Sequence, residues 1–339
     1  MLLFNSSDKK TTVIDVGLNF FLYKRSHGDG KLTFNQTILL ESLWVEKIRT
    51  QILDIQKDFP DRLIGIYIEF IHTCMDKRAF AGFANDIINP SNIFFYGLLS
   101  GTDLPLRILK DLKETGHDPY FDEDNAILYL NRPDVLDSHQ RINGCVSAIN
   151  CYLEEVIKGT ITYREEPEML SSSNIYATCY VDIKKLFLCP QHLDVMIYQM
   201  ARELLTYTFE YDSLVCTSKN GAVLASISGQ MLNIDVTYCI NIGPQFAISE
   251  QTVNQAFVPG KKYVYVYDFI CLGTEVKILQ ALLSSRQCTL VAGIGVASYI
   301  PLDNEDLGRK HSPLAVVSCM INLIRAGIQY KITVVKEDN

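Results

Sequence analysis

The segment from Tyr263 to Val276 combines residue types that could hold a charged ligand. It reads Tyr-Val-Tyr-Val-Tyr-Asp-Phe-Ile-Cys-Leu-Gly-Thr-Glu-Val, which predicts a hydrophobic strand, an acidic residue, a short loop with a glycine, and then a helix. Because the first N–H groups of a helix lack intrahelical partners, a loop that leads into a helix can bind a phosphate through its backbone. Asp268, Gly273 and Thr274 are therefore candidate ligand-binding residues, and Asp268 is also a candidate metal ligand.

A second candidate loop follows the strand expected at Ser213–Thr217. Its candidate ligand-binding residues are Ser218, Lys219, Asn220 and Gly221. In open parallel sheets, ligands bind outside the carboxyl ends of the strands, so this loop and the loops after Ile240 and Tyr267 are the places to expect chemistry.

Four of these residues also have a structural interpretation. Asp268 could cap the helix that opens near Gly273, since aspartate is a preferred helix-capping residue. Lys219 could be a solvated loop lysine, because a single lysine does not form the cluster of positive charges that is typical of an anion-binding site. Gly221 and Gly273 could be glycines because the backbone needs a conformation or a close approach that other residues do not allow. Such positions often also lie at ligand-binding sites. The sequence leaves these alternatives open.

The first half of the chain alternates helical and extended patterns, which predicts an α/β domain. Apolar residues recur at helical spacing in Gln36–Asp58, Leu104–Thr115 and Ser138–Lys158. Strands are expected at Leu63–Phe70 and Ala126–Leu130, and a strand or hairpin at Thr12–Tyr23. No motif in this half indicates a particular chemistry.

The composition changes between Tyr163 and Asn174, where Arg-Glu-Glu-Pro-Glu is followed by three serines, a pattern typical of a linker. We therefore predict two domains, residues 1–165 and residues 166–339. The second domain again alternates strands and helices, with a helix expected from Ser312-Pro313 to about Ile324 and a closing strand at Gln329–Val335. This order predicts a mostly parallel sheet with helices on both faces.

The Tyr263–Val276 segment resembles the ribose-phosphate signature of type I phosphoribosyltransferases. A wider similarity to orotate phosphoribosyltransferase runs from about Ser173 to Pro301 and includes Tyr180–Leu186, Arg202-Glu203-Leu204 and Tyr211–Ala225. The resemblance implies a phosphoribosyltransferase fold for the C-terminal half. It aligns Asp268 with the second acidic position of the signature, Gly273 with its glycine, and the turn Thr217–Gly221 with the pyrophosphate-binding loop. It also implies a homodimer, and Mg²⁺ if a phosphoribosyl ligand binds.

Several positions depart from the family's pattern. Tyr267 replaces the first acidic residue, and Ile270-Cys271-Leu272 replaces the hydroxyl side chains that would hold the 5-phosphate. No Lys or Arg occurs between Lys219 and Lys261, although the negative charge of a departing pyrophosphate needs cationic or metal partners. We therefore expect a divergent, catalytically impaired phosphoribosyltransferase-like protein. It would act as a regulatory subunit that binds a nucleotide, another phosphorylated ligand or a protein partner.

Two other functions fit the same sequence. One is an active transferase that uses phosphoribosyl pyrophosphate and Mg²⁺, with Asp268 retained and the backbone N–H groups of residues 271–275 on the phosphate. The other is an interaction protein in a larger assembly, such as a bacterial defence complex. Phosphoribosyl transfer to a base that is abolished by Asp268→Asn would indicate the active transferase rather than the impaired protein or the interaction protein.

Charge and cysteine content narrow the partners. The net charge of −8 is spread over both halves, which argues against a dominant nucleic-acid interface. Ten cysteines without a CxxC pair, mostly inside apolar runs, are typical of buried free thiols. The opening residues lack the apolar core of a signal peptide, and no uncharged stretch is long enough to cross a bilayer. We expect a cytoplasmic protein without membrane contact.

Overall fold

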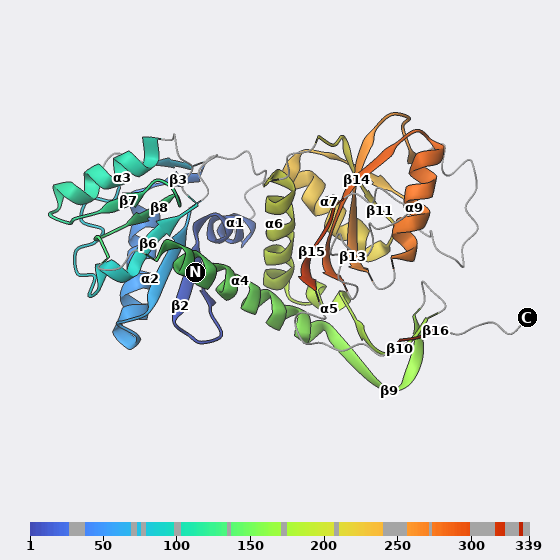
Figure 1. Ribbon diagram of the computed structural model, residues 1–339, viewed down its shortest axis with the longest axis horizontal. Helices are drawn as coiled ribbons and strands as arrows, with labels where there is room; N and C mark the ends of the chain where they lie inside the picture. Colours follow the sequence, from blue (N-terminus) through green and yellow to red (C-terminus); the bar gives the residue numbers. More distant parts are fainter. Residues whose placement is uncertain are drawn as a thin grey trace, which may run out of the picture. The chain divides into compact units, whose positions relative to one another are not determined.

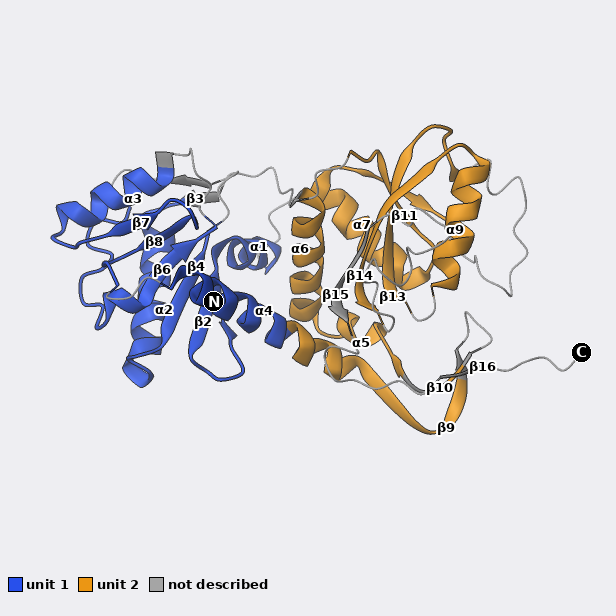
Figure 2. Cartoon of the chain, in the orientation of Figure 1, with its two compact units in different colours: residues 1–152 blue, residues 153–339 orange. Residues whose placement is uncertain are grey.

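The chain divides into two compact units, Met1–Tyr152 (unit 1) and Leu153–Asn339 (unit 2), as Figure 2 shows. The computed structural model describes residues 1–26, 38–68, 73–75, 79–97, 103–133, 137–170, 175–206, 210–239, 256–270, 273–298, 316–322 and 332–334. The border between the units falls inside a long helix, α4 (Ser138–Thr160). The boundary predicted at 165/166 lies instead within a strand, β9 (Ile161–Leu170).

Unit 1 contains a mixed sheet flanked by helices (Figure 1). Its strands are β1 (Phe4–Asn5), β2 (Thr11–Asp15), β4 (Leu63–Tyr67), β6 (Ile93–Tyr96), β7 (Tyr120–Asp122) and β8 (Ile127–Tyr129). Its other elements are α1 (Val16–Ser26), α2 (Ser42–Asp58), α3 (Asp103–Glu114), the 3-10 helix η1 (Pro90–Asn92), and a separate parallel pair, β3 (Ile38–Leu40) and β5 (Thr73–Met75). The sheet order is β1-β2-β4-β6-β8-β7, with β2, β4 and β6 parallel to one another and the remaining pairs antiparallel.

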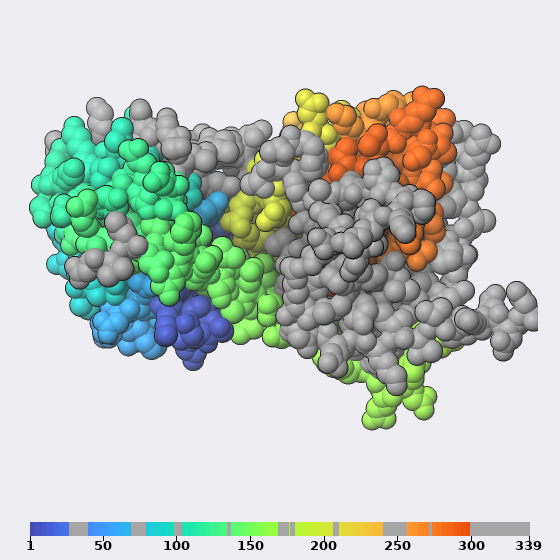
Figure 3. All heavy atoms as spheres, in the orientation of Figure 1, coloured from blue at the N-terminus to red at the C-terminus, as the bar shows by residue number. Residues whose placement is uncertain are grey.

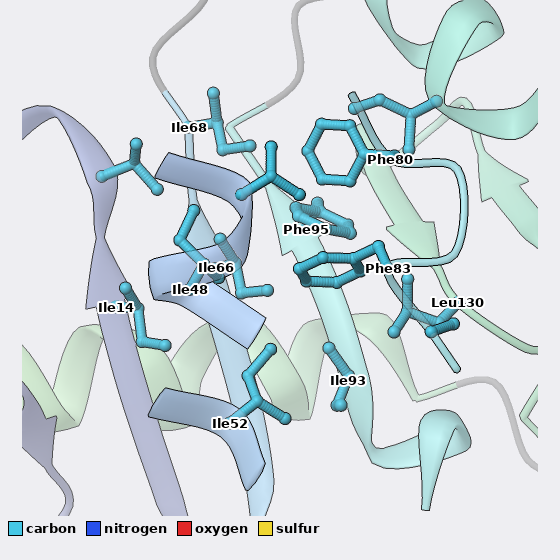
Figure 4. Packing of buried hydrophobic residues seen from close by; sticks show 14 of the residues in the cluster. Ile14, Ile48, Ile52, Ile66, Ile68, Phe80, Phe83, Ile93, Phe95 and Leu130 are labelled. Carbon is cyan, nitrogen blue, oxygen red and sulfur yellow. The ribbon is translucent and has the colours of Figure 1, made fainter. Parts of the chain in front are cut away.

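The core of unit 1 lies between α2 and one face of this sheet. Figure 4 shows Ile48 and Ile52, one helical turn apart on α2, packed against Ile66 of β4 and Phe95 of β6. All four side chains are fully buried. Full burial of one such side chain contributes about 1.5–3 kcal/mol, which explains why the helical spacing of apolar residues identified α2 from Ser42 onward. The helix expected over Gln36–Asp58 is wrong at its start, because Ile38–Leu40 form the strand β3.

The expectation of a strand or hairpin at Thr12–Tyr23 is wrong beyond Asp15. β2 ends there, and the buried Asp15 carboxylate accepts a hydrogen bond from the backbone N–H of Leu18 (2.8 Å), which starts α1. Apolar residues fill both the end of β2 and the start of α1, so periodicity alone could not separate strand from helix.

Unit 2 begins with an antiparallel sheet that includes the expected linker. β9 pairs with β10 (Ile175–Val181), and β10 pairs with β16 (Ile332–Val334). The linker prediction for 163–174 is therefore wrong up to Leu170, and residues 171–174 lie outside the described ranges. The side chains from Tyr163 to Glu168 are exposed, so a polar composition is compatible with a strand here.

The main sheet of unit 2 is parallel throughout. Its strands are β11 (Ser213–Cys216), β12 (Asp235–Tyr238), β13 (Lys262–Ile270), β14 (Thr289–Ser298) and β15 (Val316–Asn322), in the order β12-β11-β13-β14-β15. All four strand pairs are parallel. The helices described in this unit besides the end of α4 are α5 (Lys184–Phe187), α6 (Pro190–Thr206), α7 (Lys219–Leu232) and α9 (Thr274–Ser285).

Helices cover both faces of this sheet. Neighbouring residues of a strand point to opposite faces, and on β11 Leu214 lies beside Gly229 of α7 while Val215 belongs to the buried cluster that contains Leu279 of α9. Atoms of α9, orange in Figure 3, form part of the surface of unit 2. The predicted fold class, an α/β chain with a parallel sheet covered on both faces in its second half, is confirmed.

One predicted helix of unit 2 is wrong. Residues 316–322, expected within a helix that ends near Ile324, form β15 and pair with β14 in parallel register. The sequence Val-Val-Ser-Cys-Met-Ile-Asn is a short apolar run, and such a run fits a buried strand as well as a helix segment. The expected helix start at Ser312-Pro313 lies outside the described residues.

Candidate functional site

The strand order marks one position in unit 2 where a ligand is expected. Taken along the chain, the parallel strands occupy the order 2-1-3-4-5, so the chain first adds β12 on one side of β11 and then β13 on the other. In open α/β sheets of this order, ligands bind outside the carboxyl ends of the first and third strands. We call this position, at the ends of β11 and β13, the switch point.

One network of hydrogen bonds at the switch point is centred on Asp268. Its Oδ1 accepts from the Ser218 hydroxyl and its Oδ2 from the Asn220 side-chain amide, each at 3.0 Å. Ser218 is also the N-cap of α7, where its Oγ accepts from the backbone N–H of Gly221 at 2.9 Å. Asp268 thus ties the end of β13 to the first turn of α7, and we call these residues the Asp268 network.

Gly221 allows this close approach. A side-chain carbon at this position would lie 3.1 Å from the backbone oxygen of Val266 on β13 and 2.9 Å from the Ser218 hydroxyl. The backbone oxygen cannot move aside as a flexible side chain could. The glycine is therefore required by the packing of α7 on β13, as its structural interpretation holds.

A second network lies beside the first and is centred on Glu275. Thr217 Oγ1 donates to Glu275 Oε2 at 3.0 Å, and the Tyr265 hydroxyl lies 2.7 Å from Thr217 Oγ1 and 3.4 Å from the same carboxylate oxygen. Tyr265 and Thr217 are buried, whereas Glu275 is half-buried in the first turn of α9. Since a threonine hydroxyl can donate and accept, Thr217 donates to Glu275, and the single hydrogen of the Tyr265 hydroxyl is shared between Thr217 and the more distant Glu275 oxygen. We call these three residues the Glu275 network.

The surroundings shift the acidity of two groups in the Glu275 network. Burial raises the pKa of Glu275 above its ordinary value, and the negative charge of Asp268 acts in the same direction, while the hydrogen bonds from Thr217 and Tyr265 oppose the shift. Burial, with the charge of Glu275, raises the pKa of Tyr265 well above its usual range. Tyr265 therefore stays protonated and remains a hydrogen-bond donor.

The start of α9 differs from the start of α7. The N-cap of α9 is Gly273, which has a left-handed backbone (φ 69°) and makes no side-chain capping hydrogen bond. Thr274, the first residue of the helix, is half-buried. A side-chain carbon at Gly273 would meet no described atom within 4 Å.

The structure brings some of the predicted site residues together and leaves others apart. Asp268, Ser218, Asn220 and Gly221 share one network, although 50 residues separate Ser218 from Asp268. Lys219 is exposed and takes no part in these hydrogen bonds, and residues 271 and 272 of the expected phosphate loop lie outside the described residues. Their roles in ligand binding stay predictions.

Tyr265 and Glu275 were missed as site residues. Tyr265 could have been found from the sequence, because it lies on a strand expected to be buried. A buried hydroxyl needs a hydrogen-bond partner, so a polar neighbour could have been predicted for it. Glu275 gave a weaker signal, since an acidic residue in the first turn of a helix usually complements the helix dipole. Tyr267, at the family's first acidic position, is buried and packs over Gly295, where a side-chain carbon would come within 2.1 Å of its ring.

Comparisons with known proteins find likeness in structure only. No family model matches the chain, and no curated protein matches it. Solved structures similar to it include orotate phosphoribosyltransferase from Aeropyrum pernix, with 17% identity, 51% of this chain and 96% of that chain covered, and a TM-score of 0.37. Adenine phosphoribosyltransferase from Thermoanaerobacter pseudethanolicus has 16% identity, with 49% of this chain and 98% of that chain covered and a TM-score of 0.37.

The UMP synthase of Leishmania donovani is similar over more of the chain, with 84% of this chain and 75% of that chain covered, 13% identity and a TM-score of 0.41. Both these likenesses and the resemblance in sequence to phosphoribosyltransferases concern the fold. The chemistry has to be derived from the residues of this chain.

Two further observations concern groups outside the switch point. Burial raises the pKa of the Cys145 and Cys216 thiols to about 12, so both stay protonated and unreactive at neutral pH. None of the helices in the described ranges is long and apolar enough to cross a membrane.

Proposed function

We propose that unit 2 binds a small ligand with ribose-type hydroxyls, a nucleoside or a nucleotide, at the switch point, and that it has lost ordinary phosphoribosyl transfer. The chain then acts as a binding or regulatory subunit. Binding is inferred from the strand order, which places the ligand at the switch point, and the loss of transfer is inferred from the Asp268 network. The carboxylate that the family resemblance assigns to the ribose and its metal is occupied by hydrogen bonds to Ser218 and Asn220 of the same chain.

Electrostatics support the loss of transfer. Departing pyrophosphate needs preorganised cationic or metal partners, and loss of one stabilising donor typically costs a factor of about 10²–10³ in rate. The charged side chains of the two networks are the carboxylates Asp268 and Glu275, and the neighbouring Lys219 is exposed. The start of α7, where the resemblance places the pyrophosphate, is already filled by Ser218 and Asp268.

The residues present do not fit a resident Mg²⁺. A magnesium ion demands oxygen ligands in near-octahedral geometry, and the Asp268 network supplies a single carboxylate, whose two oxygens are held by hydrogen bonds from α7 and its N-cap. Within the described ranges, no three His, Cys, Asp or Glu side chains group together as metal ligands would. Ligand binding at the switch point is therefore proposed without a metal.

A thermal-shift titration of the full chain tests the proposal. Nucleosides, nucleoside monophosphates, phosphoribosyl pyrophosphate and pyrophosphate are each added with and without Mg²⁺. A ligand that binds only the native state raises the melting temperature by mass action. We expect a rise with nucleosides or monophosphates, no rise with pyrophosphate, and no transfer to any base.

The control separates this proposal from an active transferase. Asp268→Asn is compared with Asp235→Asn, which makes the same chemical change at an exposed position of β12. The proposed loss of transfer is overturned if the wild type transfers a phosphoribosyl group to a base and Asp268→Asn, but not Asp235→Asn, abolishes this activity. Flat curves with every ligand would overturn ligand binding and favour a protein partner. The homodimer, the protein partner and the cytoplasmic compartment stay predictions.

A further inference from the structure

The Glu275 carboxylate lies in the first turn of α9, at the switch point where the proposed ligand would bind. Glu275 is the second residue of α9, and α9 starts at Gly273 without a side-chain cap. A helix start attracts anions through its free N–H groups and its dipole. Here a carboxylate of the chain itself lies in the first turn of the helix, with its Oε2 turned toward β11 and β13.

Hydrogen bonds from two strands fix this carboxylate. Thr217, directly after β11, donates to Oε2, and Tyr265 of β13 lies within 3.4 Å of the same oxygen. Both donors are buried, so they cannot follow Glu275 if it swings outward. Release of the carboxylate would leave the two hydroxyls without this acceptor, which costs free energy.

The Asp268 network repeats this arrangement at the other helix. Asp268 lies against the first turn of α7, held by Ser218 and Asn220. The starts of both helices at the switch point therefore already carry a carboxylate from the chain. A second anion placed beside either of them meets a like charge, which disfavours it strongly in a partly buried site.

We propose that Glu275 is a specificity-determining residue that makes the switch point prefer an uncharged, hydroxyl-bearing ligand, a nucleoside, over its 5′-monophosphate. This inference rests on the proposed function, since it concerns the ligand of the same site. The carboxylates accept hydrogen bonds from ligand hydroxyls or amino groups and repel a phosphate. Both hydrogen bonds that the described residues donate to Glu275 reach Oε2, and we assign the ligand contact to Oε1.

Binding calorimetry of the full chain at pH 8 tests the inference with adenosine and uridine and with their 5′-monophosphates. For the wild type we expect affinity for one of the nucleosides to exceed that for its monophosphate by about tenfold or more, the size of a partly screened like-charge contact. Glu275→Gln keeps the shape of the side chain and removes its charge. It should bring the ratio of the two affinities to about one or below.

Three matched variants sharpen the test. Glu275→Asp keeps the charge and should keep the preference for the nucleoside, while Glu275→Ala removes the charge by a second route and should lose it. Glu210→Gln makes the same change on a side chain of unit 2 that is 93% exposed, so it should leave the ratio as in the wild type. A purely structural role of Glu275 would lower both affinities together and leave their ratio unchanged.

The outcomes distinguish this inference from the proposed function. A wild type that prefers the monophosphate, or an affinity ratio that Glu275→Gln and Glu275→Ala leave unchanged, overturns the specificity role while ligand binding stands. If neither nucleosides nor monophosphates bind to the wild type or to any variant, the proposed function falls and the specificity role falls with it.

Discussion

The starts of α7 and α9 belong to the same edge of the same sheet, yet they are built in opposite ways. α7 begins behind Ser218, an extended residue whose side chain caps the helix and binds Asp268. α9 begins behind Gly273, a left-handed glycine without a capping side chain, and its Glu275 is turned toward β11 and β13.

The difference suggests that the start of α7 has a structural role, whereas the start of α9 can interact with a ligand. At α7, the Ser218 hydroxyl both donates and accepts within the chain, and Gly221 lets the helix press on β13. At α9, no atom of the described residues lies within 4 Å of a side-chain carbon built on Gly273, and one carboxylate is buried enough to have a raised pKa. We therefore expect substitutions at α7 to change stability and substitutions at α9 to change binding.

The largest effect on stability is expected from Gly221→Ala. The new carbon would lie 3.1 Å from the Val266 backbone oxygen, so α7 must shift away from β13 and the Ser218 cap is disturbed. Overpacking of this kind typically costs about 1–3 kcal/mol, and loss of the cap adds to it. We expect the free energy of unfolding of unit 2 to fall by about 3 kcal/mol, measured by urea unfolding followed by far-UV circular dichroism.

The chain supplies controls for this measurement. Trp44, its only tryptophan, lies in α2 of unit 1, so its fluorescence follows unit 1 and should not change. Gly159→Ala, at a glycine in α4 with no described atom near the added carbon, should be neutral or stabilise by about 0.5–1 kcal/mol. Equal effects of the two alanine substitutions would contradict the close contact between α7 and β13.

A smaller loss is expected from Ser218→Ala. It removes the cap of α7 and one of the two donors to Asp268, and N-cap substitutions of this kind cost about 0.5–2 kcal/mol. Ser285→Ala, at an exposed serine in the last turn of α9, serves as the matched control and should stay within about 0.5 kcal/mol of the wild type. Both are compared by the same urea unfolding, and a Ser218→Ala curve that overlays the control would mean that the Asp268 network adds no stability.

The sequence predicted the α7 side of this comparison better than the α9 side. Strand ends of a parallel sheet meet at one edge, so the order of strands and loops in the sequence is enough to pair the loop after β11 with the end of β13. Asp268, Ser218 and Asn220 do meet there. The Glu275 network could not be inferred in this way. Its partners Thr217 and Glu275 are 58 residues apart, and only the packing of α9 turns the glutamate inward.

The errors in the fold have a related physical cause. Residues 316–322 and the start of α1 are short apolar segments whose state is decided by neighbours distant in the sequence. β15 is a strand because β14 offers a free edge, and α1 is a helix because Asp15 starts it. Long amphipathic segments such as α2 need no such neighbour, since their own spacing of apolar residues fixes the buried face.

The smallest expected effect is a pH dependence of stability that comes from Glu275. Its pKa in the folded chain is raised above the ordinary value of 4.5, so the native state binds this proton more tightly than the unfolded state does. The stabilisation from the proton is fully present below the ordinary value and is lost as the pH rises through the raised pKa. Glu275→Gln has no proton to lose at this position. Between about pH 4.5 and pH 8, its free energy of unfolding should therefore increase relative to that of the wild type by about 1 kcal/mol or less.

Urea unfolding of the wild type and Glu275→Gln at about pH 4.5, 6 and 8 measures this difference directly. Other groups titrate alike in both proteins, so their contribution cancels when the two free energies are subtracted. A difference that grows with pH would show that unit 2 keeps an unfavourable charge at the start of α9, as a residue retained for ligand selection would. Two parallel curves would instead place Glu275 with Ser218, as a structural contact, and remove the contrast between the two helix starts.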